Sequence, residues 1–91
     1  NAALLQNYPN PFNPETWISY SLPNSGYVKV SVYDILGSEI RTIRDGIEGV
    51  GYNEVVWDAR SNTGSQVSSG VYVCKIYYGG AIRAIKMILM R

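Results

Sequence analysis

The sequence contains no histidine and only one cysteine, Cys74. Nucleophilic triads and most zinc sites need an imidazole, so these two kinds of chemistry are excluded. One cysteine cannot form an intrachain disulfide, and Cys74 lies in an apolar segment, where a small core residue is the favoured interpretation. Charged residues are also few, at 16% of the chain with a net charge of +1, so no nucleic-acid partner is expected.

Carboxylates are the remaining candidates for catalysis, because a pair of them can hydrolyse glycosides. Asp34, Asp45 and Asp58, however, each stand at the end of a predicted strand, which is the ordinary structural position of aspartate. The segment 58–64 has oxygen-bearing residues at alternate positions, as calcium loops do, but Arg60 occupies a ligand position and a turn is favoured. We therefore expect a non-enzymatic domain without a metal or a cofactor.

No apolar run is long enough to cross a membrane as a helix, and no signal peptide opens the chain. Apolar residues nowhere follow a helical repeat. Short segments of alternating apolar and polar residues recur instead, with turn residues roughly every eight to twelve positions. At 91 residues the chain forms one domain, and its pattern predicts an all-β antiparallel sandwich of about seven strands, with a barrel as the alternative.

The segment 27–34 is the clearest predicted strand. Val28, Val30 and Val32 alternate with polar residues, so they are expected to form one buried row. The sequence D-I-L-G at 34–37 then predicts a turn, since aspartate accepts backbone hydrogen bonds and glycine adopts positive φ. This strand is expected at the centre of the sheet.

The remaining strands are predicted from the same alternation and from turn residues. Gly79-Gly80 is a two-residue hairpin signal between two of them, and the glycine-rich segment 46–51 is expected to be a loop. The predicted strands are 16–22, a weak edge strand at 38–45, 52–58, 70–78 and 81–90. Val55 and Trp57 are assigned to the core, and three further sets each share one face of their strand: Ile18, Tyr20 and Leu22; Tyr72, Cys74, Ile76 and Tyr78; and Ile85, Met87 and Leu89.

The first 15 residues contain three of the four prolines, at positions 9, 11 and 14. Proline excludes a helix here and favours irregular or edge geometry. A plain linker would not carry Leu4, Leu5, Tyr8 and Phe12. Residues 1–15 are therefore predicted to be a proline-rich lead-in that docks on a sandwich formed by 16–91 and covers an edge. The opening Asn-Ala-Ala suggests a module cut from a longer protein.

Aromatic residues are abundant, with eight tyrosines and two tryptophans. Carbohydrate-binding sandwiches present such rings to the faces of sugars, and core packing is the alternative role. The residues that could form a platform of this kind are Trp17, Tyr27, Tyr33, Tyr77 and Tyr78.

Five motifs in chain order resemble those of one family: Y-P-N-P-F-N-P-E-T-W-I at 8–18, V-S-V-Y-D-I-L-G at 30–37, G-Y-N-E-V-V-W-D at 51–58, S-S-G-V-Y-V at 68–73 and I-K-M-I-L-M-R at 85–91. With these, the whole chain resembles the C-terminal sorting domains of the type IX secretion system (type A, the Por secretion tail), which occur on exported proteins of Bacteroidetes-like bacteria. The middle motifs are shared with the immunoglobulin-like domain of flagellar hook-capping proteins.

The resemblance implies an immunoglobulin-like sandwich that directs an N-terminal passenger through the outer-membrane secretion machinery. It implies transit through the periplasm, then release or cell-surface attachment, with a processing protease as a further partner. Recognition would fall on the last strand at Lys86, Met87, Ile88 and Leu89. The other motif residues would be mainly structural: Pro9, Asn10, Pro11, Asp34, Gly37, Trp57, Asp58, Gly70 and Tyr72.

Other interpretations of the ends and of the whole domain stay open. A terminal strand can be read by β-augmentation, but Lys86 could equally be a solvated residue that guards an edge against aggregation. Exposed edges also favour a dimer through edge strands. The domain as a whole could instead be a carbohydrate-binding or structural accessory module of a secreted hydrolase.

Overall fold

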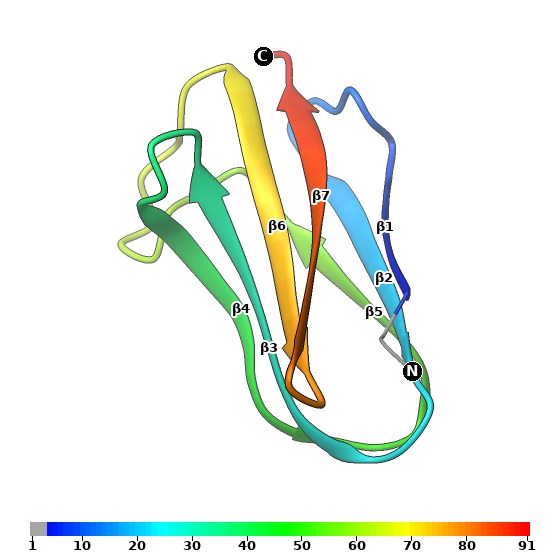
Figure 1. Cartoon of the computed structure of the whole chain (residues 1–91). Coiled ribbons are helices and arrows are strands. Elements are labelled where there is room, and N and C mark those ends of the chain that lie inside the picture. Colours follow the sequence, from blue (N-terminus) through cyan, green and yellow to red (C-terminus); the bar gives the residue numbers. More distant parts are fainter. Residues whose placement is uncertain (1–3) are drawn as a thin grey trace.

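Two antiparallel sheets face each other and enclose the core (Figure 1). The computed structural model describes residues 4–91, and within them no helix could cross a membrane. The seven strands are β1 (Leu4–Tyr8), β2 (Thr16–Leu22), β3 (Gly26–Asp34), β4 (Glu39–Glu48), β5 (Gly51–Trp57), β6 (Gly70–Tyr78) and β7 (Ala81–Leu89). The predicted all-β immunoglobulin-like sandwich is confirmed.

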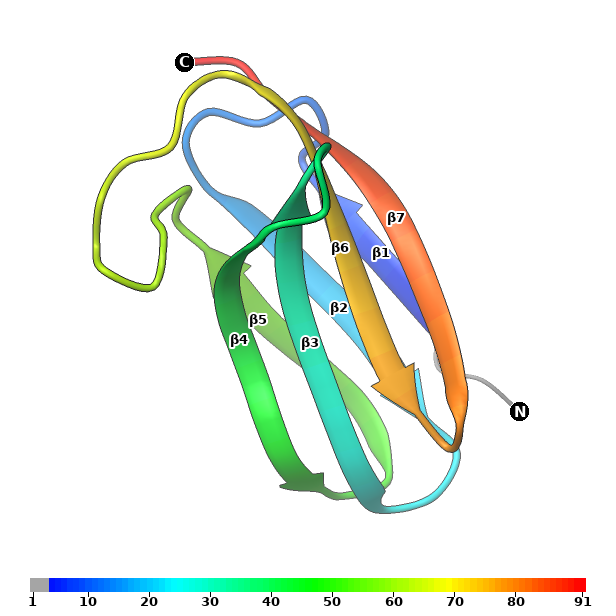
Figure 2. The same ribbon diagram turned by 60° about the vertical axis from the view of Figure 1, so that its left-hand side comes forward.

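One sheet has the strand order β1-β2-β5 and the other has the order β4-β3-β6-β7, so β3 lies inside its sheet as expected. All pairs of neighbouring strands are antiparallel. The view in Figure 2 shows the two layers and the loop between β5 and β6, which extends from one end of the sandwich. The edges of the sandwich are therefore β1 and β5 on one sheet and β4 and β7 on the other.

The core forms because β2, β3, β5 and β6 alternate inward apolar residues with outward ones, which places one set of side chains between the sheets. The predicted row of Val28, Val30 and Val32 is fully buried. Other buried residues come from both sheets and lie in the predicted core or on the predicted shared faces: Ile18, Tyr20, Leu22, Val55, Trp57, Tyr72, Cys74, Ile76, Met87 and Leu89. Burial of these side chains is the main favourable contribution to folding.

Ser31 departs from the predicted alternation in β3. It was expected to face outward, but its side chain is fully buried and its hydroxyl donates a hydrogen bond of 2.8 Å to Glu39 Oε2. The register between β3 and β4 shifts on both sides of this position. The irregularity brings the Glu39 side chain over Ser31, so the hydroxyl keeps a hydrogen-bond partner after burial.

The expected loop at 46–51 is wrong, because β4 continues through Gly46 to Glu48 and only two residues connect it to β5. Gly46 pairs with Val28 and Ile47 pairs with Tyr27, so the ladder with β3 overrides the low strand propensity of glycine. The alternation of apolar and polar residues does not reveal this extension, because its residues do not alternate between a buried and an exposed face.

The segment 1–15 was expected to be irregular or to form an edge, and it does both: 9–15 is an irregular loop and 4–8 is an edge strand, while residues 1–3 lie outside the described residues. Leu4–Tyr8 is strand β1, which pairs with β2 and buries Leu5 in the core. The lead-in is therefore an edge strand of the sandwich followed by a loop that crosses to the other sheet.

Candidate functional site

The candidate site is the outer edge of β7, together with the loop at 9–15 that lies against it (Figures 1 and 2). Of the four residues predicted for recognition, Met87 and Leu89 point into the core and are almost completely buried. Lys86 is exposed and Ile88 is half-buried on the opposite face of the strand. The folded domain therefore presents only Lys86 and Ile88 to a partner, because the other two side chains hold β7 in place.

Asn10 binds the outer edge of β7 through its side-chain amide. Its Nδ2 donates a hydrogen bond of 3.1 Å to the Lys86 carbonyl, and its Oδ1 accepts one of 3.0 Å from the Ile88 N–H. The amide group thus supplies one donor and one acceptor to the edge, as a neighbouring strand would. Asn10 itself is exposed to solvent.

Phe12 continues this pairing with its backbone. Its N–H donates to the Ile88 carbonyl at 2.9 Å, and its carbonyl accepts from the Met90 N–H at 3.0 Å. Phe12 thereby forms a parallel bridge with Leu89 of β7. We call the contact of Asn10 and Phe12 with residues 86–90 the clasp.

The clasp is anchored in the core by the Phe12 ring, which is 2% exposed. Its centroid lies 5.7 Å from that of Trp57, and Trp57 in turn makes an edge contact with Tyr72 at 5.4 Å. Such tilted aromatic pairs are favourable beyond the area they bury. The Phe12 ring packs on Trp57 of one sheet, and Trp57 packs on Tyr72 of the other, so this row of rings connects the loop to both sheets.

Polar groups at the base of the loop fix its path. Thr16 Oγ1 donates a hydrogen bond of 2.9 Å to the Pro9 carbonyl, and Asn7 Nδ2 donates one of 3.2 Å to Thr16 Oγ1. Thr16 is fully buried, so these contacts satisfy a hydroxyl that would otherwise be costly to bury. Pro9 and Pro11 are exposed, and they restrict the backbone on either side of Asn10.

Arg91 ties the segment after β7 to the loop between β5 and β6. Its N–H donates to Ser69 Oγ at 3.0 Å, its Nε donates to the Val67 carbonyl at 2.7 Å, and its Nη2 donates to the Ala59 carbonyl at 3.0 Å. The clasp therefore holds residues 86–90, and these hydrogen bonds hold Arg91, which follows them.

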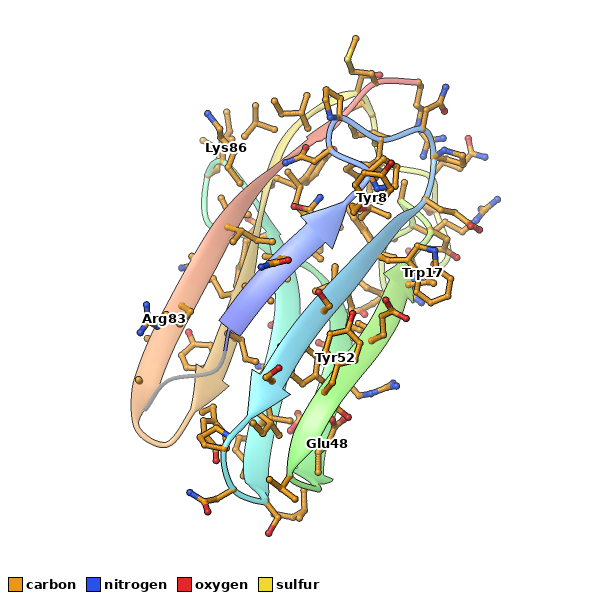
Figure 3. All side chains as sticks on the ribbon, turned by 90° about the vertical axis from the view of Figure 1, so that its right-hand side faces the viewer. Tyr8, Trp17, Glu48, Tyr52, Arg83 and Lys86 are labelled. Atoms are coloured by element: carbon orange, nitrogen blue, oxygen red, sulfur yellow. The ribbon has the colours of Figure 1, made fainter. Side chains whose placement is uncertain are left out.

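The remaining part of the β7 edge is open in the sense that no strand pairs with it among residues 4–91, although β1 packs close beside it (Figure 3). The clasp uses outward backbone groups of Lys86, Ile88 and Met90, and the same alternation turns those of Ile82 and Ala84 outward. Within residues 4–91 no hydrogen bond to the outward groups of Ile82 and Ala84 is found. Both side chains are exposed, so an added strand could pair along Ile82–Lys86 and would stop at the clasp.

The other predicted motif residues lie in the scaffold and away from this edge. Asp34 Oδ1 accepts hydrogen bonds from the N–H groups of Leu36 and Ser38 at 3.0 and 2.9 Å, and Gly37 has a φ of 90° that L side chains rarely adopt. These two residues close the turn between β3 and β4, as the sequence predicts.

Motif residues of β5 and β6 likewise make structural contacts. Trp57 Nε1 donates to the Arg60 carbonyl at 3.0 Å, and Asp58 Oδ1 accepts from Arg41 Nη1 at 3.3 Å. The Tyr72 hydroxyl donates to the Ser68 carbonyl at 2.7 Å, just before Gly70 opens β6 opposite Leu89. Among residues 4–91, no three His, Cys, Asp or Glu side chains gather closely enough to hold a metal ion.

Perturbed pKa values do not mark a reactive group at this edge. Burial raises the pKa of the Cys74 thiol to about 12, which keeps it protonated and unreactive. Hydrogen bonds from Thr42 and Ser31 lower the pKa of Glu39, and a hydrogen bond to Asp45 raises the pKa of Tyr27. These three groups lie on β6, β4 and β3, and none of them lies on β7.

The predicted aromatic platform is not a single surface. Trp17 projects from the outer face of the three-stranded sheet, whereas Tyr27, Tyr33 and Tyr77 alternate outward on the four-stranded sheet. Tyr78 is half-buried and its hydroxyl donates to the Asn24 carbonyl. The pattern of residues along each strand does not show which strands share a sheet, so it could not separate Trp17 from the tyrosines.

The sequence motif contains Asn10 but gives no sign of its contact with β7. An asparagine between two prolines has the local signature of a turn residue. Its actual partners lie 76 and 78 positions away, so only the folded chain shows the clasp.

Among solved structures, the chain is similar to dimeric latent PorU from Porphyromonas gingivalis, with a TM-score of 0.73 and 24% identity over 97% of this chain and 9% of that one. It is also similar to PorZ, described as an essential bacterial surface component of the type IX secretion system of the same organism, with a TM-score of 0.61 and 25% identity over 96% and 11% of the two chains. The chain thus spans about a tenth of the length of these two proteins.

A third similar structure is FlgD from P. aeruginosa, with a TM-score of 0.60 and 26% identity over 82% of this chain and 59% of that one. A search of the curated proteins found no match. The profile of the FlgD Ig-like domain matches residues 16–81, which is most of the chain and includes strands β2 to β6. The chain therefore belongs to the FlgD Ig-like domain family.

Proposed function

We propose that this domain is a C-terminal sorting domain that directs a passenger protein through the type IX secretion system. In this role it is a non-catalytic recognition module. Its partners are the outer-membrane secretion machinery, a processing protease and the covalently linked passenger. It passes through the periplasm and ends outside the cell or on its surface.

The similarity to PorZ supports this proposal over an assembly role like that of FlgD. PorZ is a component of that secretion system, and the likeness covers 96% of this chain, whereas the likeness to FlgD covers 82%. The family profile ends at residue 81, so β7 and the clasp lie outside the matched residues. These are also the segments that carry the sorting-domain motifs at 8–18 and 85–91.

The observation that carries the proposal is the open segment Ile82–Lys86 on the edge of β7. Its outward backbone groups at Ile82 and Ala84 can bind an added strand, which gives affinity. Lys86 is the exposed charge at the end of this segment, next to the clasp, and would give specificity. A partner strand would thus be placed in register by the clasp and by one lysine.

An export assay tests this function. Residues 1–91 are fused to the C-terminus of a periplasm-directed reporter in a bacterium that has a type IX system, and the reporter is measured in the periplasm and in the medium. We expect deletion of residues 84–91 to leave the reporter in the periplasm. Because this deletion also removes the buried Met87 and Leu89, a point variant is needed.

Lys86→Glu keeps the core residues and reverses only an exposed charge, so we expect a folded domain that is exported at least several-fold less. Arg83→Glu makes the same charge change on the same strand, and Figure 3 shows both side chains on β7. Export at the normal level for Lys86→Glu and for the deletion would overturn the proposal. Equal losses for Lys86→Glu and Arg83→Glu would show that net charge, and not this position, matters.

A further inference from the structure

The outer face of the three-stranded sheet has an unusual set of exposed side chains. Outward positions of β1, β2 and β5 carry Tyr8, Trp17 and Tyr52, which are 79%, 49% and 66% exposed. Figure 3 looks onto this face, with these three residues labelled over the strands. Single exposed apolar residues are ordinary on a protein surface, but rings gathered on one face mark a candidate ligand site.

The strand register places these residues in rows. Tyr8 lies opposite Trp17, and Tyr52 lies opposite Ser21, four positions along β2 from Trp17. The Cα atoms of Trp17 and Tyr52 are therefore separated by roughly 14 Å, from the rise along the strand and the spacing between strands. A short oligosaccharide, and not a single sugar ring, spans this length.

A polar row lies between the two aromatic ends. It consists of Gln6, Ser19 and Glu54, which are aligned across the three strands. The Tyr52 hydroxyl donates a hydrogen bond of 3.0 Å to Glu54 Oε2, and Oε1 of the same carboxylate has no hydrogen-bond partner within residues 4–91. Amide, hydroxyl and carboxylate groups can together donate to and accept from sugar hydroxyls.

The rings and the polar row enclose a shallow hollow of about 280 Å³. Its lining includes Trp17 and Tyr52 as well as Ser19 and Glu54. Sugar rings have apolar C–H faces and hydroxyl-rich rims, so they stack on aromatic faces while their rims bind polar groups. The alternation of ring, polar row and ring along this sheet matches that chemistry.

Charge narrows the class of ligand. The described outward positions of β1, β2 and β5 contain one carboxylate, Glu54, and no lysine or arginine. An anionic polymer such as a nucleic acid or a polyuronate would meet a negative charge without a compensating cation. The occupant is therefore an uncharged polymer.

We propose that the outer face of the β1-β2-β5 sheet binds a neutral polysaccharide chain, with Trp17 and Tyr52 stacking on sugar rings and Gln6, Ser19 and Glu54 binding hydroxyl groups. This site lies on the face of the three-stranded sheet, whereas the edge of β7 belongs to the four-stranded sheet, so the proposal does not rest on the proposed export function. It gives the domain a second role in holding its carrier on a glycan.

Affinity electrophoresis of the intact chain in gels that contain mixed-linkage β-glucan, xylan, galactomannan or polygalacturonate tests the proposal. We expect at least one neutral polysaccharide to retard the protein and polygalacturonate to have no effect. Trp17→Ala and Tyr52→Ala should each weaken binding about tenfold or more, because stacking on an aromatic ring accounts for an energy of this order. Trp57 is fully buried, so a fluorescence change on titration reports Trp17.

Tyr27→Ala is the matched control, because Tyr27 is also 49% exposed but lies on the other sheet. It should bind as the parent protein does, and circular dichroism checks that all variants are folded. The proposal is overturned if no neutral polysaccharide retards the folded protein, if polygalacturonate binds equally well, or if Tyr27→Ala weakens binding as much as Trp17→Ala. It is also overturned if sedimentation shows a dimer that Trp17→Ala dissociates, since the face would then bind a second copy.

Discussion

The segment 16–81 and the two ends that flank it, 4–15 and 82–91, are held in different ways. The middle contains β2 to β6 and supplies most of the buried side chains, including the valine row of β3. The ends supply β1 and β7 and bind each other through the clasp. The family profile thus covers the middle, while the clasp joins the two ends that lie outside the profile.

The difference in burial has an energetic meaning. Core side chains of the middle lose contact with water completely, so their removal affects the whole sandwich. The polar contacts of the clasp are partly solvent-exposed, and water can replace them at small cost. We therefore expect the middle to determine global stability and the clasp to determine local order at β7.

Trp57→Ala should have the largest effect. The side chain is fully buried and contacts both Phe12 and Tyr72, so its removal leaves a cavity and costs about 3–5 kcal/mol of unfolding free energy. Urea denaturation followed by circular dichroism measures the loss. The exposed Trp17→Ala is the matched control and should change stability by about 0.5 kcal/mol or less. Equal losses for the two tryptophans would contradict the assigned burial.

Alkaline pH should destabilise the middle through Cys74. Burial raises the pKa of its thiol from 9.0 to about 12, so the folded state disfavours the thiolate. The thiol therefore contributes its full stability below pH 9, and this contribution is lost as the pH rises toward 12. Denaturation midpoints across this range should fall more steeply for the parent protein than for Cys74→Ala, which keeps all tyrosines. If the midpoints of the two proteins fall equally with pH, burial of Cys74 does not oppose ionisation of its thiol.

Asp34→Ala tests hydrogen bonds of the middle. It removes two bonds to backbone N–H groups in the turn between β3 and β4, at a cost of about 1–2 kcal/mol. The same denaturation experiment measures it, and Asp34→Asn, which keeps one acceptor oxygen, should recover part of the loss. A neutral Asp34→Ala would mean that Gly37 alone is sufficient to form the turn.

Asn10→Ala should have the smallest global effect, although it also removes two hydrogen bonds. We expect a loss of less than about 1 kcal/mol in unfolding free energy, because Asn10 is exposed. The Ile88 amide, however, loses its acceptor and should exchange with deuterium about tenfold faster or more. Asn13→Ala, at a loop asparagine outside the clasp, is the control. If Asn10→Ala destabilises as much as Asp34→Ala, the distinction between middle and ends fails.

Much of the middle could be predicted because its alternation is local. Val28, Val30 and Val32 define the inner face of β3 from the sequence, and Gly79-Gly80 identifies the hairpin between β6 and β7. Both signals use neighbours in the chain, for which residue type decides the conformation.

The contacts of the ends, and the sheet to which each strand belongs, could not be predicted because they depend on residues far apart in the chain. The clasp joins Asn10 to Lys86, and β4 extends past Gly46 only because β3 is beside it. Likewise, the separation of Trp17 and Tyr27 between two sheets depends on which strands pair. Such long-range pairing leaves no periodic signal in the residues concerned.

The clasp also has a consequence for the order in which the chain can fold. Asn10 leaves the ribosome or a translocation pore 76 residues before Lys86, so its side chain has no strand to bind until almost the whole domain has emerged. Contacts that join such distant residues form late, because the intervening chain must first be ordered. Until β7 has formed, the loop at 9–15 has no strand to bind, and closure of the clasp therefore distinguishes a finished domain from an incomplete one.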